Sequence, residues 1–458
     1  MDFKQNYENL LTRMKYKETT GKIEHNNLTK SPLIPFRSRA DRADYSNGFK
    51  CILGELARIE LNKKWIDDFK INESIGDIVS NPRLEIEDGC DEYLEKILKE
   101  YLFNTNDELN ILNPYLFLYI PLSKNNHATG EKEVALFLRD IFCRGNEKLK
   151  RFFCENTSNH GFISLILKSI SPLEDETRKS KYIPILDNIV ELFNEDIMFA
   201  LNYDKFLIKN IDIILSYYYF FYISQLILKV NKFYDESIDE IEQLYFLLDW
   251  ENVSKNRKTI TYGYDFLDTN ANYFAAKSSV VDQLNILFGG EYCLLGDIYN
   301  KFSQLNHEDK ENFLYYLKEW VNIYHKARGY DEIELPDDFK ELIDILFNDL
   351  NGEKGIDNEI RTSRYPLNLR ELCEAFFVKN RGRYSQVFNI DREFLLTITA
   401  LCVKEEKIKL SQLFIEYEKR GLYFDRYSKE EIEKFLTNLN LIDKKSDSGD
   451  AKYVKSIL

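Results

Sequence analysis

One stretch of the sequence, residues 213–228, runs for sixteen positions without a charged side chain. It reads IILSYYYFFYISQLIL, and Asp212 and Lys229 bound it closely. A helix that crosses a bilayer needs about 20 predominantly apolar residues, and this stretch is shorter and includes four Tyr, two Ser and one Gln. A helix that is apolar on every side must be covered by other parts of the chain. The stretch therefore predicts a buried central helix, and we expect no membrane association.

The rest of the sequence predicts a mostly α-helical protein. Apolar residues recur at helical spacing in many segments, strand signals are few, and 458 residues are too many for one compact core. The polar, glycine-bearing segment 351–364 marks the clearest boundary. We therefore expect a multi-helix body with a C-terminal winged-helix-like α+β domain. The expected parts are an N-terminal segment, partly extended and then helical (1–110), a helical body (111–355) and the winged-helix-like domain (360–458).

The pattern of the last 70 or so residues is the reason for the winged-helix expectation. It predicts, in order, a helix, a short strand, two helices, a strand, a turn and a strand, at residues 391–406, 407–410, 411–421, 428–440, 441–445, 446–450 and 452–458. Ser428, with Glu431 three residues later, predicts a capping box at the start of the third helix. This order of elements is similar to a winged-helix domain, in which the final hairpin is the wing.

Charge is distributed unevenly along the chain, whose net charge is −15. Residues 1–50 and 361–458 each carry a net charge of +4, so the segment between them carries −23. An acidic body repels nucleic acid at long range. We therefore expect any contact with DNA to be confined to the basic ends.

Within the C-terminal domain, the third helix and the wing differ in charge. The helix has three acids against two lysines, which does not favour reading of base edges in the major groove. Candidate partner-binding residues on this helix are Glu430, Glu433 and Lys434. Lysines of the wing and arginines of a preceding basic loop are candidates for sequence-independent contact with DNA phosphates: Lys444, Lys445, Lys452, Lys455, Arg381 and Arg383.

No catalytic, metal-binding or cofactor-binding motif is recognisable in the sequence. It has no phosphate-binding Gly-rich loop with Lys-Ser/Thr and no metalloprotease or nucleophile-elbow motif, and its five histidines are scattered. The seven cysteines include no Cys-x-x-Cys pair, which is typical of buried thiols in a reducing cytoplasm. We therefore expect no cofactor and assign no catalytic residue.

Two other functions stay open at this point. A divergent metal-dependent nuclease could assemble its carboxylates only in three dimensions; the residues considered are in LPDDFK (335–340) and in the pair Glu405 and Lys407. A winged-helix regulator would instead bind one preferred DNA duplex. Pro and acids in the first turn of a helix explain the LPDDFK segment fully.

Two regions of the sequence together resemble a known family. They are SPLIPFRSRADRADYSNGFKCILGE (31–55) and the C-terminal region from FFVKNRGRYSQVFNIDREFLLTITALCVKEEKI (376–408) through LIDKKSDSGDAKYVKSIL (441–458). With the chain length and the acidic helical middle, they resemble the DptG (DndG) family. The resemblance implies a non-catalytic subunit of a bacterial restriction system that attacks DNA lacking a phosphorothioated backbone. It also implies DptF- and DptH-like partner subunits, and it carries over no catalytic residues.

Overall fold

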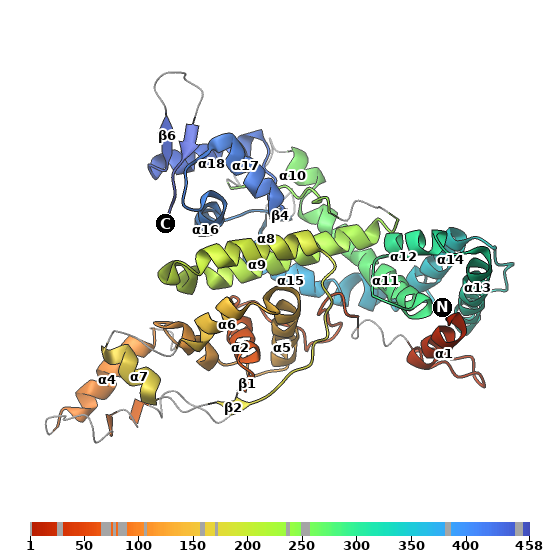
Figure 1. Cartoon of the computed structure of the whole chain (residues 1–458), viewed down its shortest axis with the longest axis horizontal. Helices are drawn as coiled ribbons and strands as arrows, with labels where there is room; N and C mark the ends of the chain where they lie inside the picture. Colours follow the sequence, from red (N-terminus) through yellow and green to blue (C-terminus); the bar gives the residue numbers. More distant parts are fainter. Residues whose placement is uncertain are drawn as a thin grey trace. The chain divides into compact units, whose positions relative to one another are not determined.

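The computed structural model of the chain is mostly helical, which confirms this part of the predicted fold class. The structure describes residues 2–24, 31–65, 75–76, 79–80, 89–104, 108–155, 161–169, 173–234, 239–248, 257–380, 386–444 and 452–458. The strands in these ranges form small antiparallel sheets. Figure 1 shows the arrangement of the elements within the chain and labels most of the helices.

Two compact units divide the chain, and each combines segments that are distant in sequence. Unit 1 comprises Met1–Arg42, Tyr182–Glu191 and Tyr218–Ile457, and unit 2 comprises Ala43–Lys181, Leu192–Tyr217 and Leu458. The three consecutive parts expected from the sequence stay a prediction. The C-terminal domain and the second half of the apolar stretch belong to the same unit.

Unit 2 is built around the helix α2, in which eight consecutive residues, Ile52 to Ile59, are buried. Gly54 allows this close packing, because a Cβ atom added there would lie 2.8 Å from the Cβ of Ile120. The elements of unit 2 are α2 (Lys50–Glu60), β1 (Lys63–Lys64), α4 (Asp91–Leu102), η1 (Pro114–Tyr119), α5 (His127–Leu138), η2 (Arg139–Cys143), α6 (Glu147–Cys154), α7 (Gly161–Ser169), β2 (Glu174–Asp175) and parts of α8 (Asp187–Ala200) and α9 (Asp204–Asn231).

Unit 1 contains the remaining described elements. They are α1 (Phe3–Arg13), the other parts of α8 and α9, α10 (Arg257–Thr261), α11 (Tyr264–Phe288), α12 (Leu295–Ser303), α13 (His307–Ala327), α14 (Phe339–Asn351), η4 (Ile360–Arg364), α15 (Leu367–Phe376), β3 (Val378–Asn380), β4 (Gln386–Phe388), α16 (Arg392–Val403), β5 (Ile408–Lys409), α17 (Leu410–Lys419), α18 (Arg426–Asn438), β6 (Ile442–Lys444) and β7 (Lys452–Val454).

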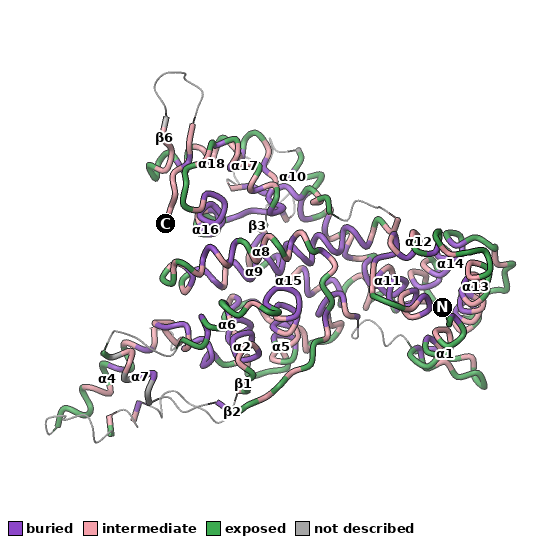
Figure 2. The backbone as a smooth tube through the Cα atoms, in the orientation of Figure 1, coloured by how far each residue is buried: buried purple, intermediate pink, exposed green. Residues whose placement is uncertain are grey.

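The helix α9 contains the apolar stretch, and the prediction of a buried helix there is confirmed. Residues 214–228 are all at most 3% exposed, and Figure 2 shows α9 in purple over most of its length. By length and composition α9 could cross a membrane, but 89% of its most apolar window is buried within the protein. Its buried polar groups have partners: the hydroxyl of Tyr222 accepts a hydrogen bond from the amide of Ile185 at 2.8 Å, and the side chain of Gln225 pairs with the backbone of Glu242. Such pairing offsets the cost of burying them.

The C-terminal part of unit 1 follows the predicted order of elements closely. From α16 to β7 it runs helix, strand, helix, helix, strand and strand, and its sheet has the antiparallel order β5-β7-β6. We call residues 386–458, which comprise β4 and these elements, the C-terminal module. Its core is apolar and contains Leu395, Ile398, Leu413, Tyr417, Ile432, Leu436 and Val454, all fully buried.

The predicted capping box at Ser428 is wrong. The helix α18 begins two residues earlier, and its N-cap is Asp425, whose carboxylate accepts a hydrogen bond from the amide of Ser428 at 2.9 Å. Asp425 has extended backbone geometry (φ −75°, ψ 179°), which an N-cap requires, and the buried Phe424 precedes it. Packing of Phe424 fixes where the chain turns into the helix, so the earlier acid becomes the cap.

An extended segment, residues 241–248, fastens the C-terminal module to the rest of unit 1. The amide of Leu247 donates to the carbonyl of Phe388 at 3.0 Å, and the amide of Phe246 donates to the carbonyl of Tyr423 at 2.9 Å. The ring of Phe220 on α9 lies 5.6 Å from that of Phe388 and 6.1 Å from that of Phe246. The module therefore shares one hydrophobic core with α9.

Candidate functional site

A groove lies at the start of α18, on the helix that the sequence singles out for partner binding. It has a volume of about 540 Å³ and contains two of the predicted residues, Glu430 and Glu433. Its other lining residues come from α10, α17, α18 and the segment before α18: Lys258, Phe414, Phe424, Asp425, Arg426 and Lys429. We call these eight residues the α18 groove. Aromatic rings therefore share this surface with charges of both signs.

Charged side chains of the groove are paired within the protein. Arg426 donates to Glu430 at 2.9 Å, one helical turn along α18. Lys429 pairs with Glu418 of α17 at 3.1 Å, and its ammonium lies 5.0 Å from the centre of the Phe414 ring. These pairs are partly or largely exposed, and solvent screens surface ion pairs of this kind. They fix the positions of charges on the surface more than they stabilise the fold.

The structure brings candidate DNA-binding lysines together with acids. Lys452 of β7, a strand predicted to belong to the wing, pairs with Glu433 of α18 at 2.5 Å, so two residues predicted to bind different partners contact one another. Lys455 pairs with Asp443 at 3.0 Å. The hydrogen bond from Lys455, together with the nearby charge of Lys407, lowers the pKa of the Asp443 carboxyl below its ordinary value.

The remaining predicted residues are placed as follows. Lys434 pairs with Glu431 at 2.6 Å on the exposed side of α18. The backbone of Lys444 lies opposite that of Lys452 in the β6–β7 ladder. Lys445, Arg381 and Arg383 lie outside the described residues.

Lys258 is a groove residue that no sequence pattern indicates. Its ammonium donates to the hydroxyl of Tyr245 at 3.0 Å, and this hydrogen bond raises the pKa of Lys258. Lys258 is far from α18 in the sequence. The pairing of residues 244–247 with Phe388, Ile390 and Tyr423 brings this part of the chain beside the C-terminal module. No local sequence pattern encodes these contacts.

The acids of the LPDDFK segment have structural partners. Asp338 caps α14 by accepting a hydrogen bond from the amide of Glu341 at 3.0 Å, and Asp337 pairs with Lys318 at 2.7 Å. The ammonium of Lys340 lies over the rings of Tyr234 and Tyr299. Within the described ranges, no group of three or more His, Cys, Asp and Glu side chains is arranged to hold a metal ion.

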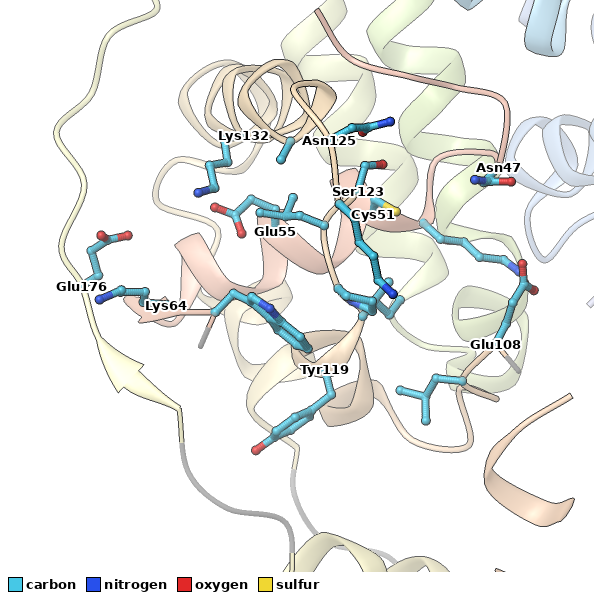
Figure 3. Close-up of a pocket in the computed structure, with 18 of the residues that line it drawn as sticks. Asn47, Cys51, Glu55, Lys64, Glu108, Tyr119, Ser123, Asn125, Lys132 and Glu176 are labelled. Carbon is cyan, nitrogen blue, oxygen red and sulfur yellow. The ribbon is translucent and has the colours of Figure 1, made fainter. Parts of the chain in front are cut away.

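A second and larger cavity, of about 1040 Å³, lies in unit 2 (Figure 3). Its lining includes the buried carboxylate of Glu55, which pairs with Arg58 at 2.8 Å and with Arg178 at 2.7 Å. Cys51 also lines it, and burial raises the pKa of this thiol to about 11. A thiol with so high a pKa is protonated at neutral pH and is a poor nucleophile.

Comparison with known proteins does not assign the chain to a family. No protein-family model and no curated protein sequence matches the chain. The chain is therefore described by its structure, as a mostly helical protein whose C-terminal helix-and-strand module carries a groove of mixed charge.

Proposed function

We propose that the protein is a non-catalytic adaptor subunit of a DNA phosphorothioation-dependent restriction complex, and that it docks a partner subunit through the α18 groove. The assignment to this system comes from the resemblance of residues 31–55, 376–408 and 441–458 to the DptG family. The observation that carries the docking role is the groove itself, with its aromatic lining and its charges of both signs. A protein segment with both apolar and charged side chains suits such a surface.

We further propose that the C-terminal module is a winged helix. Support comes from the order of its elements and from the strand order β5-β7-β6, which places the last hairpin beside the first short strand. In this proposal α18 takes the place of the recognition helix and β6 and β7 form the wing.

The ion pairs favour a protein partner over DNA for this surface. Lys452 and Lys455, two of the wing lysines, already face the carboxylates of Glu433 and Asp443. A lysine that is paired with an acid releases fewer counterions when it approaches a phosphate, so its contribution to DNA binding falls. Contact between the wing and DNA is therefore a secondary and sequence-independent role in this proposal.

Co-expression with DptF- and DptH-like subunits of the proposed system, followed by size-exclusion chromatography at low salt, tests the adaptor role. We expect a stable complex that the Glu430→Lys, Glu433→Lys double variant weakens about tenfold or more, because it reverses two charges in the groove. The matched control is Glu291→Lys with Glu353→Lys, which makes the same charge change at exposed positions of unit 1 away from the groove. Elution of the wild-type protein alone would refute the adaptor role.

A gel-shift experiment tests the wing. Replacement of Lys444, Lys445, Lys452 and Lys455 with Glu should abolish any binding of duplex DNA by the protein. An unchanged shift would remove the wing from the DNA-binding surface. A strong preference for one duplex sequence would instead favour the regulator function.

A further inference from the structure

The large cavity of unit 2 is basic although the chain as a whole is acidic. Its lining includes five cationic side chains and three carboxylates, so these residues carry a net charge of +2 in a chain whose net charge is −15. The cations are Lys50, Lys64, Lys124, Lys132 and Arg178, and the acids are Glu55, Glu108 and Glu176. A concave basic site within an acidic protein selects an anionic ligand.

The three carboxylates are already used by other cations. Glu55 pairs with Arg58 and Arg178, Glu176 pairs with Arg178 at 2.6 Å, and Glu108 pairs with Lys50 at 3.0 Å. By contrast, Lys124 and Lys132 have no ion-pair partner among the residues that the structure describes. In Figure 3 the side chains of Lys132 and Glu55 lie on the same side of the cavity, but the two arginines already hold the carboxylate. Two lysines therefore remain available to an anion.

Aromatic side chains form another part of the lining. Trp65, Phe103 and Tyr119 line the cavity, and the guanidinium of Arg58 lies 5.3 Å from the centre of the Trp65 ring. Arg58 is fully buried, and it also donates to the carbonyls of Leu118 and Ile120 at 2.9 and 2.7 Å. It thereby holds the Trp65 ring near the loop that follows η1. A ring held in this way is a platform for stacking of a planar group.

We propose that this cavity binds a nucleotide, with the base stacked on Trp65 and the phosphate held by Lys124 and Lys132. This lining matches a ligand that combines an anionic group with a planar aromatic group. A volume of about 1040 Å³ accommodates a nucleotide. The ligand is either a free nucleotide or one nucleotide of a single strand. Because burial raises the pKa of Cys51 to about 11, this thiol stays protonated at neutral pH, and the proposed binding involves no thiolate. This inference is independent of the proposed function, because it concerns unit 2 and the α18 groove belongs to unit 1.

Binding of two probes to the full-length protein tests the proposal. Adenosine monophosphate is followed by calorimetry, and fluorescein-labelled single-stranded oligothymidylate is followed by anisotropy, both at physiological salt. We expect at least one probe to bind. Comparable affinity for both probes identifies a free nucleotide as sufficient, whereas binding of the oligonucleotide alone identifies a strand as the source.

Two sets of variants locate the site. Lys124→Glu with Lys132→Glu should lower the affinity about tenfold or more and reduce its dependence on salt, because phosphate contacts are lost. Lys148→Glu with Lys205→Glu makes the same charge change at exposed positions of unit 2 outside the cavity lining, and it should leave the affinity within about twofold.

The stacking platform is tested separately. Trp65→Ala should also lower the affinity about tenfold, and Trp65→Phe should restore most of the lost affinity because it keeps a ring.

Three results would overturn the proposal: binding of neither probe, an equal loss of affinity in both double variants, or full affinity in Trp65→Ala. Circular dichroism and thermal unfolding of every variant identify a loss of binding that comes from misfolding. If Trp65→Ala fails to fold, the Lys124→Glu, Lys132→Glu double variant still tests the proposal, because both of its substitutions are at exposed positions. Groove variants such as Glu430→Lys should bind the probes normally, so a failed docking proposal does not affect this one.

Discussion

Among single residues, the buried acid Asp282 on α11 shows how tertiary structure changes the pKa of a side chain. Its side chain is 3% exposed and accepts hydrogen bonds from the hydroxyl of Tyr292 and, at 3.4 Å, from that of Ser31. Burial raises the pKa of Asp282 from 3.8 to about 7, although both hydrogen bonds oppose the shift. Removal of the carboxylate from water costs more than two hydroxyl donors recover.

This raised pKa predicts that the contribution of Asp282 to stability falls as pH rises toward neutrality. Between pH 3.8 and about 7 the folded state binds more protons at Asp282 than the unfolded state does. The contribution of Asp282 is therefore fully present below pH 3.8 and is lost as pH rises through about 7. Urea unfolding at several pH values in this window measures the effect.

The Asp282→Asn variant is the matched comparison, because the amide oxygen still accepts hydrogen bonds and the residue no longer titrates. We expect its free energy of unfolding to depend less steeply on pH than that of the wild type across this window. Identical pH dependence in the two proteins would show that Asp282 titrates normally in the folded state.

At the scale of elements, the turn between α17 and α18 depends on Gly421. Its φ is +75°, a left-handed conformation that residues with side chains rarely adopt, and a Cβ atom there would lie 2.4 Å from the ring of Phe221 on α9. The positive φ and the close approach to Phe221 have the same cause: the chain reverses direction at this turn while it packs directly against α9.

Gly421→Ala should therefore destabilise the protein by about 2–4 kcal/mol, the sum of backbone strain and overpacking. Chemical denaturation measures the change. Gly329→Ala is the control, since Gly329 also has a positive φ but has no atom within 4 Å of an added Cβ. Its cost should be limited to backbone strain, about 1 kcal/mol. Equal losses in the two variants would rule out the contact with Phe221 as a cause.

At the scale of the whole molecule, the C-terminal module is part of unit 1 and shares its core with α9. Phe220 and Phe246 contact Phe388, and the backbone of residues 244–247 pairs with residues on both sides of α16 and α17. Exposure of a buried phenylalanine costs about 1.5–3 kcal/mol, and removal of the module uncovers several apolar side chains at once.

A chain truncated after residue 385 should therefore unfold at a lower temperature than the full chain and aggregate, as measured by thermal unfolding and light scattering. Co-expression with residues 386–458 as a separate fragment should restore a soluble complex, because the two pieces share one core. An independently appended domain predicts the opposite: two soluble fragments that do not associate, with the longer one as stable as the full chain.

Sequence patterns predicted the features that depend on neighbours along the chain. The buried helix around residues 214–228 and the order of elements in the C-terminal module follow from apolar spacing and turn residues within a few positions. The error at Ser428 arose because Asp425 also fits a cap, and the packing of Phe424 decides between them.

Local patterns along the chain are sufficient to predict a mostly helical protein, the burial of its most apolar helix and the order helix, strand, helix, helix, strand and strand of its last elements. Three arrangements could be found only in the folded chain: Lys452 faces Glu433, Lys258 joins the α18 groove, and Trp65 lies in a basic cavity with Lys124 and Lys132. Helix formation and burial depend on local periodicity, whereas ion pairs and cavities are made by residues whose separation in sequence carries no repeating pattern.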